Sequence, residues 1–242
     1  MSKVVTTTVL PDVAGGSVTL GGTGDSVVVT GNDIRTNTLQ DAGGNAVFTS
    51  NGSGVLSGMN SAFAGAMKLI QTQTASNAAS VSFTTGIDST YDVYIFKFYD
   101  VNPATDEVKF AFQANASGQS GYNETITSTF FTARHGEGGF GADMYYGTSH
   151  DQAQGTAFQQ LAFVGDHADM STAGELFLFA PSSTTYVKNF YCTLNCYHHD
   201  ETSHNDYIAG YFNTTAAITD IQFKMESGNM DAVIKMYGIS KS

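Results

Sequence analysis

The sequence predicts an all-β protein, an antiparallel jelly-roll sandwich preceded by a glycine-rich N-terminal β arm or shaft. Only 13% of the 242 residues are charged, and Gly, Ser, Thr and Asn are abundant, which favours sheets and turns over charged surface helices. The 17 Phe and 12 Tyr residues provide the volume for a core, although Trp is absent. Many short segments alternate apolar and polar residues with a period of two, which is typical of half-buried strands.

The segment from Gly86 to Gln113 shows this alternation most clearly, and we expect it to form a long β-hairpin. One face of its second arm carries Val108, Phe110 and Phe112. The matching face of its first arm carries Tyr94, Phe96 and Phe98. Between the arms, Asn102-Pro103 and Asp106 supply the residues that turns favour.

The first arm is also apolar on its opposite face, through Val93 and Ile95. A strand that is apolar on both faces needs cover on both. That cover is either a second layer of the same chain or a neighbouring subunit. Together with Phe48, these residues are therefore candidates for a trimer interface.

Residues 1–60 form the predicted arm, in which short β-prone runs are separated by Gly pairs, with a tight turn at Asp41–Asn45. Phe48 is the only aromatic residue in it. Such a segment buries too little apolar area to offset the ordering of its backbone, about 1–2 kcal/mol per residue. We expect two further copies in a trimeric shaft, or the surface of a partner, to order it; folding back onto its own domain is the alternative.

A short helical linker is expected at residues 61–75, where an Asn60 or Ser61 cap precedes Ala, Met, Lys and Leu. The sandwich domain is expected at residues 76–242, and the absence of predicted helices between its strands indicates antiparallel pairing. Its ten predicted strands are Ala79–Thr84, Tyr91–Asp100, Glu107–Gln113, Glu124–Ala133, Gly155–Val164, Glu175–Ala180, Tyr186–Tyr197, Asp206–Asn213, Ala217–Met225 and Asp231–Ile239.

Three short motifs in this domain are GIDSTYD at Gly86–Asp92, NPATD at Asn102–Asp106, and the final strand Ala232–Ile239, which ends in YGI. They resemble a module of structural and tail-fibre proteins of marine bacteriophages, cyanophages among them. The resemblance implies a virion component and carries over no catalytic or binding residues. It favours a receptor-binding appendage attached by the N-terminal arm, with a capsid decoration or head-fibre protein as the alternative.

The charge of the chain excludes direct binding to nucleic acid, because the net charge is −12 and only 10 residues are Lys or Arg. No apolar run approaches the ~20 residues that span a bilayer, and the N-terminus lacks a secretory signal. We therefore expect assembly in the host cytoplasm, a final location on the virion surface, and no membrane insertion. The expected partners are two further copies of the chain, other virion proteins, and a glycan or protein of the host surface.

The segment Arg134–Gln154 is predicted to be a long loop, which is uncommon unless it serves a function or an interface. Its candidate receptor contacts are His135, Phe140, Tyr145, Tyr146 and His150. Exposed aromatic rings suit recognition of a sugar or a protein, and packing against a subunit is an equally good explanation.

The same loop contains the carboxylates of Glu137, Asp143 and Asp151, which leaves a polysaccharide-degrading spike enzyme as a third function. Glycosidase chemistry needs two carboxyl groups about 5–9 Å apart, and acidic residues in a glycine-rich loop are usually solvated. We therefore expect no enzymatic activity and no catalytic residues.

A metal site is suggested near Tyr197–Asn205, where His198 and His204 lie among acidic residues. Cys192 and Cys196 share a predicted strand face with Phe190 and read as small buried hydrophobic residues. Four strand residues span ~13 Å, too far for both thiols to share an ion or form a disulfide. We expect neither metal nor cofactor, with an ion held by His198 or His204 on a trimer axis as the minor alternative.

Overall fold

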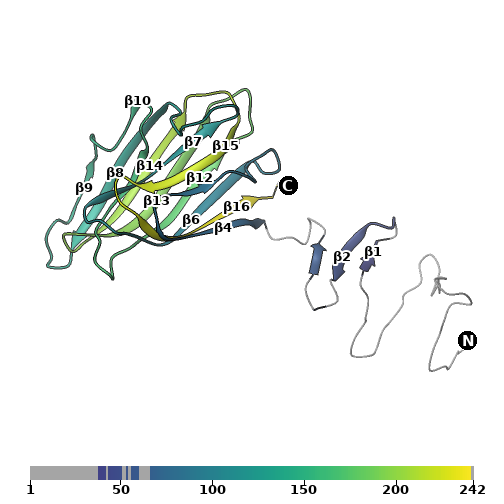
Figure 1. The fold of residues 1–242 in the computed structure, drawn as a ribbon, viewed down its shortest axis with the longest axis horizontal. Coiled ribbons are helices and arrows are strands. Elements are labelled where there is room, and N and C mark those ends of the chain that lie inside the picture. Colours follow the sequence, from purple (N-terminus) through teal and green to yellow (C-terminus); the bar gives the residue numbers. More distant parts are fainter. Residues whose placement is uncertain (1–37, 42, 51–52, 54–55, 60–65, 241–242) are drawn as a thin grey trace, which may run out of the picture. The chain divides into compact units, whose positions relative to one another are not determined.

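The computed structural model describes residues 38–41, 43–50, 53, 56–59 and 66–240, and the chain divides into two compact units, Met1–Asn60 and Ser61–Ser242. Strands and turns make up the described residues of both units, and none of these residues is helical (Figure 1). Consequently, no helix in the described part of the chain is long and apolar enough to cross a bilayer.

The strands are β1 (Thr38–Gln40), β2 (Ala46–Ser50), β3 (Leu56–Met59), β4 (Met67–Ala78), β5 (Val81–Phe83), β6 (Val93–Pro103), β7 (Val108–Ala116), β8 (Ile126–Gly136), β9 (Asp143–Tyr146), β10 (Ala153–Gly155), β11 (Gln159–Val164), β12 (Thr172–Phe179), β13 (Lys188–His198), β14 (Thr202–Phe212), β15 (Ile218–Met225) and β16 (Met230–Ile239).

The first unit contains a three-stranded antiparallel sheet in the order β1-β2-β3. The predicted turn at Asp41–Asn45 is present, since Asp41 Oδ1 accepts hydrogen bonds from the backbone N–H groups of Gly43 (2.8 Å) and Asn45 (2.9 Å). None of the residues whose side chains are described in this unit is buried, and Phe48 is half-buried. The rest of the predicted arm, residues 1–37 above all, lies outside the described residues.

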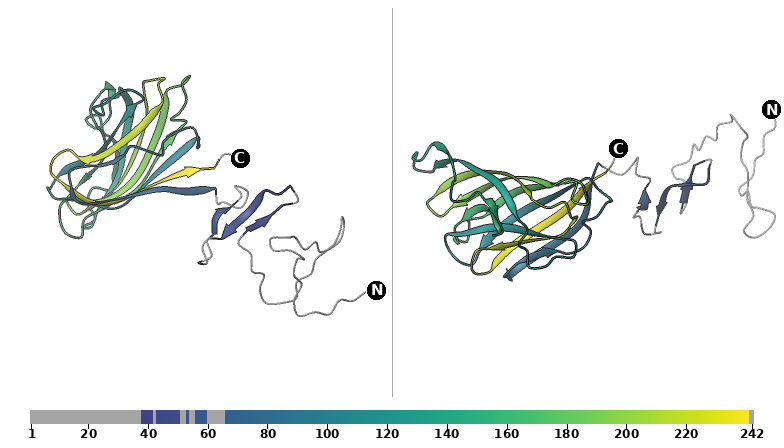
Figure 2. Two further views of the ribbon diagram at one scale, coloured as in Figure 1. Left: turned by 45° about the vertical axis from the view of Figure 1, so that its right-hand side comes forward. Right: turned by 90° about the horizontal axis from the view of Figure 1, so that it is seen from above.

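The second unit is the predicted β-sandwich. Its larger sheet has nine strands in the order β10-β8-β14-β13-β12-β6-β16-β4, with β9 also paired to β8, and its smaller sheet has the order β11-β7-β15-β5. Successive strands cross repeatedly from one sheet to the other, as in a jelly roll, and the pairs within each sheet are antiparallel (Figure 2). The all-β fold class and the sandwich are confirmed, and each of the ten predicted strands overlaps an observed one.

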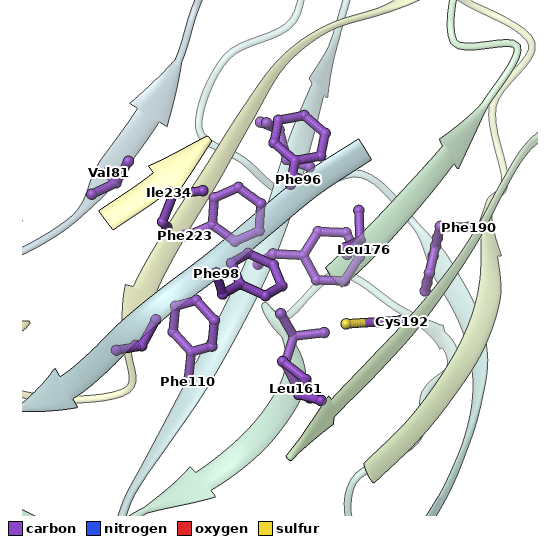
Figure 3. Packing of buried hydrophobic residues seen from close by; sticks show 14 of the residues in the cluster. Val81, Phe96, Phe98, Phe110, Leu161, Leu176, Phe190, Cys192, Phe223 and Ile234 are labelled. Carbon is purple, nitrogen blue, oxygen red and sulfur yellow. The ribbon is translucent and has the colours of Figure 1, made fainter. Parts of the chain in front are cut away.

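The predicted hairpin at Gly86–Gln113 is wrong in its pairing. Strand β6 pairs with β12 and β16 in the large sheet, whereas β7 pairs with β11 and β15 in the small sheet. The aromatic faces of the two arms do meet, but across the sandwich: the rings of Phe98 and Phe110 have centroids 5.3 Å apart, and Phe223 lies against both (Figure 3).

Two further expectations are corrected by the strands. From Met67 to residue 75 the predicted helical linker is part of β4, an edge strand that pairs with β16; residues 60–65 lie outside the described part of the chain. The predicted loop Arg134–Gln154 contains the end of β8, all of β9 and the start of β10.

Ile95 does not need a neighbouring subunit to cover it. Its side chain is 5% exposed within the single chain, on a strand whose cross-strand partners place Phe177 and Tyr237 beside it. Val93 is half-buried. Side chains from the adjacent strands of the large sheet therefore cover Ile95 within the single chain.

Candidate functional site

The candidate site is a pocket of about 370 Å³ on the inner face of the large sheet. Strand β11, at the edge of the small sheet, lies against β13 and, less closely, β14. Phe130 and Phe163 contribute apolar walls, and the polar lining is concentrated in His198, His199, His204 and Asp206. The pocket thus lies at the point where the small sheet no longer covers the inner face of the large sheet. The inward-facing side chains of the large sheet are polar at this point.

The β13–β14 hairpin places these polar groups. His198 pairs with Thr202 in the register, so residues 199–201 form a three-residue loop, and Glu201 adopts a left-handed backbone with φ of 59°. This geometry is common in hairpin loops of three residues. The strand alternation then points Thr202, His204 and Asp206 to the same inner face as His198.

The imidazole rings of His198 and His204 are stacked, with centroids 4.3 Å apart and planes inclined by 7°. His198 Nδ1 lies 2.7 Å from Asp200 Oδ1, and the Thr202 hydroxyl donates to the same carboxylate oxygen. Because a carboxylate only accepts, the neutral His198 ring carries its proton on Nδ1, which leaves a lone pair on Nε2. His204 Nε2 is buried and has no hydrogen-bond partner.

The electrostatics of the pocket keep both rings neutral near pH 7. Burial, with a smaller contribution from His198, lowers the pKa of His204 to about 4. Burial also lowers the pKa of His198, against the opposing effect of Asp200. Burial raises the pKa of Asp200, but hydrogen bonds from Thr202 and His198 outweigh it, so that its pKa is lowered. Two neutral imidazoles therefore lie beside an ionised carboxylate.

Asp206 is the most unusual acid of the pocket. It is 2% exposed, and burial raises its pKa to about 7, with the Thr132 hydroxyl acting in the opposite direction. Near neutral pH the protonated and ionised forms are thus comparably populated. Perturbed acids of this kind are enriched at functional sites.

The predicted receptor contacts are divided by the structure. Tyr145 and His150 line the pocket, and the His150 ring lies 5.1 Å from that of Phe130. His135, Phe140 and Tyr146 lie outside it: His135 and Tyr146 are exposed, and Phe140 is 51% exposed with its ring over Gly136.

Sequence reasoning did not identify Asp206 and Glu107 as site residues. His199 Nε2 lies 2.8 Å from Glu107 Oε1, which brings the turn before β7 to the pocket. The alternation along β14 did contain a signal for Asp206. Asp206 lies on the same strand face as Ile208 and Phe212, so a carboxylate occupies a core position.

The cysteines behave as predicted. Cys192 and Cys196 are free and buried, and burial raises the pKa of both thiols. Cys196 Sγ donates to the carbonyl oxygen of Phe163 at 3.1 Å. Both thiols are therefore core groups that remain protonated at neutral pH.

Comparisons with models of known protein families, with curated proteins and with solved structures yielded no match.

Proposed function

We propose that this chain is a structural protein of a bacteriophage virion, a homotrimeric surface appendage of the receptor-binding type. In this role residues 1–60 attach the protein to the particle, and the sandwich is displayed outward to bind a glycan or protein of the host surface. The protein assembles in the host cytoplasm and acts by binding, without catalysis. A capsid decoration or head-fibre protein is the alternative location.

The observation that carries the proposal is the surface of residues 137–146, which comprise the turn after β8 together with β9 and which we call the aromatic hairpin. Phe140 is 51%, Met144 70%, Tyr145 39% and Tyr146 48% exposed. Four large apolar or aromatic side chains in so short a segment are typical of a recognition surface.

The base of the aromatic hairpin is held in place. Arg134 donates to Asp143 at two points, Nε to Oδ1 (2.7 Å) and Nη2 to Oδ2 (3.2 Å), and its guanidinium lies 5.2 Å from the centre of the Tyr145 ring. The Tyr146 hydroxyl donates to Asp151 at 2.6 Å. A surface fixed before binding loses less conformational entropy on contact, which suits a receptor-binding role.

The trimer is proposed from the first unit. The described side chains there include no buried residue, so its sheet lacks a core of its own among those residues. Backbone ordering needs apolar burial from elsewhere, and two further copies supply it symmetrically. The burial of Ile95 within one chain moves the expected trimer contacts toward this unit and away from the outer face of β6.

The solution mass of the full-length protein tests the trimer. We expect light scattering after size exclusion to give three times the chain mass of 25.6 kDa. A monomer at micromolar concentration contradicts the trimer.

The location is tested on intact particles that carry the encoding gene. An antibody raised against the full chain, viewed by electron microscopy, is expected to label the tail or its fibres. Label distributed over the head supports the capsid alternative, and particles without label or without the protein in their mass spectrum contradict the virion role.

A further inference from the structure

We propose that His198, Asp200 and His204 form a binding site for a divalent transition-metal ion, with zinc as the best-fitting ion. One ligand atom from each residue can be chosen such that all three lie within 4.8 Å of one another. Two imidazoles and a carboxylate are the donor set that zinc and iron(II) sites use. The inference is independent of the proposed role in a virion.

The second observation that points to a ligand is the Nε2 atom of His204. The residue is 5% exposed, and this nitrogen has no hydrogen-bond partner. A buried polar atom without a partner is destabilising, and such atoms are rare in folded proteins. A metal ion bound to His204 removes that penalty.

The residues around the site favour an ion over a structural hydrogen-bond cluster. Asp200, with a side chain 38% exposed, keeps one side of the cluster open to solvent as an entry path. The Thr202 hydroxyl already donates to this carboxylate and orients it, as groups hydrogen-bonded to the ligands do in metal sites.

Binding requires a small rearrangement. Zinc bonds to nitrogen and oxygen are about 2.0–2.2 Å long, so tetrahedral ligand atoms lie about 3.4 Å apart. The rings of His198 and His204 are stacked and nearly parallel, so a side-chain rotation is needed to direct one nitrogen of each ring toward a shared ion. His198 ends β13 and Asp200 lies in the middle of the three-residue loop, so the ion also fixes the end of the β13–β14 hairpin.

The test is equilibrium dialysis of chelator-treated, full-length protein against micromolar Zn²⁺. We expect about one ion per chain, and a loss of affinity of at least about tenfold in His204→Gln and in Asp200→Asn. His135→Gln is the matched control, because His135 lies on β8 of the same sheet but is exposed on its outer face; this variant should bind as the wild type does.

Co²⁺ as a spectroscopic probe identifies the ligand atoms. We expect visible absorption from nitrogen and oxygen ligands without a thiolate charge-transfer band, because both cysteines are protonated in the core. Circular dichroism without metal shows whether each variant folds. If His204→Gln fails to fold, Asp200→Asn still tests the proposal, because Asp200 lies on the exposed side of the cluster. Wild-type protein without bound zinc, equal binding by folded Asp200→Asn, or a thiolate band overturns the proposal.

Discussion

The ring of Tyr91 lies directly against Gly238, so closely that a Cβ atom at residue 238 would be 2.3 Å from Tyr91 Cδ2. Tyr91 precedes β6 and Gly238 lies near the end of β16, opposite Tyr94 in the register. The Tyr91 ring also meets that of Tyr94 edge to face, with centroids 5.7 Å apart. The GIDSTYD motif at Gly86–Asp92 and the final strand Ala232–Ile239 thus contact each other and serve the fold.

This contact predicts that Gly238→Ala destabilises the protein by about 1–3 kcal/mol, because the added methyl group overlaps the ring. The cost should fall in a Tyr91→Ala background, where the ring is absent. A double-mutant cycle measured by chemical denaturation is expected to give a coupling of at least about 0.5 kcal/mol. Additive effects of the two substitutions would show that Gly238 is required for another reason.

The contact between Phe98 and Phe110 predicts a large effect on stability. Both rings are buried and lie on opposite sheets, so Phe98→Ala opens a cavity in the middle of the sandwich. We expect a loss of about 3–5 kcal/mol in the free energy of unfolding. Tyr186→Ala is the control: its side chain is 72% exposed, and the change should stay within about 0.5 kcal/mol. A loss below about 1 kcal/mol for Phe98→Ala contradicts the described packing.

The same pair of rings shows what the sequence could and could not provide. Alternation located the strands and their inner faces, because it depends only on the side-chain period. It could not show that β6 and β7 belong to different sheets, since the facing rings of a hairpin and those of a sandwich produce the same pattern. The helix expected near Met67 was wrong because β4 pairs with β16 along almost its whole length, and tertiary pairing overrides weak local propensity.

The candidate site was predictable only in part. By residue type His198 and His204 were only a minor alternative for a metal site, because their convergence depends on the register of the β13–β14 hairpin, which places the loop at residues 199–201. Glu107 reaches His199 through the tertiary fold, and nothing near it in the sequence indicates this contact.

Asp206 predicts a specific pH dependence of stability. Its pKa is about 7 in the folded chain and ordinarily 3.8. Between these two pH values the folded chain holds a proton that the unfolded chain has released. The contribution of Asp206 to the free energy of unfolding is therefore full below pH 3.8 and is lost as pH rises through 7. His204, with a folded pKa of about 4 and an ordinary value of 6.5, acts in the opposite direction.

Asp206→Asn isolates the first of these contributions. From pH 5 to pH 8 the difference in unfolding free energy between the variant and the wild type should shift in favour of the variant by roughly 2–3 kcal/mol. Urea denaturation at each pH, with a chelator present in all samples, provides the measurement. Parallel stability profiles for the two proteins would mean that the Asp206 carboxyl ionises as readily in the folded chain as in the unfolded one.

The aromatic hairpin predicts a separation of binding from stability. Phe140 and Met144 are 51% and 70% exposed, so the double substitution to Ser should change the free energy of unfolding by about 1 kcal/mol or less. Under the proposed receptor-binding role these side chains form the centre of the contact, and retention of the protein by cells that carry the proposed receptor should fall by at least about tenfold. Tyr186→Ser removes an equally exposed ring elsewhere on the sandwich and should leave retention unchanged. Equal retention of all three proteins would place the receptor contact outside residues 137–146, whereas an equal loss in the Tyr186 variant would indicate non-specific adhesion.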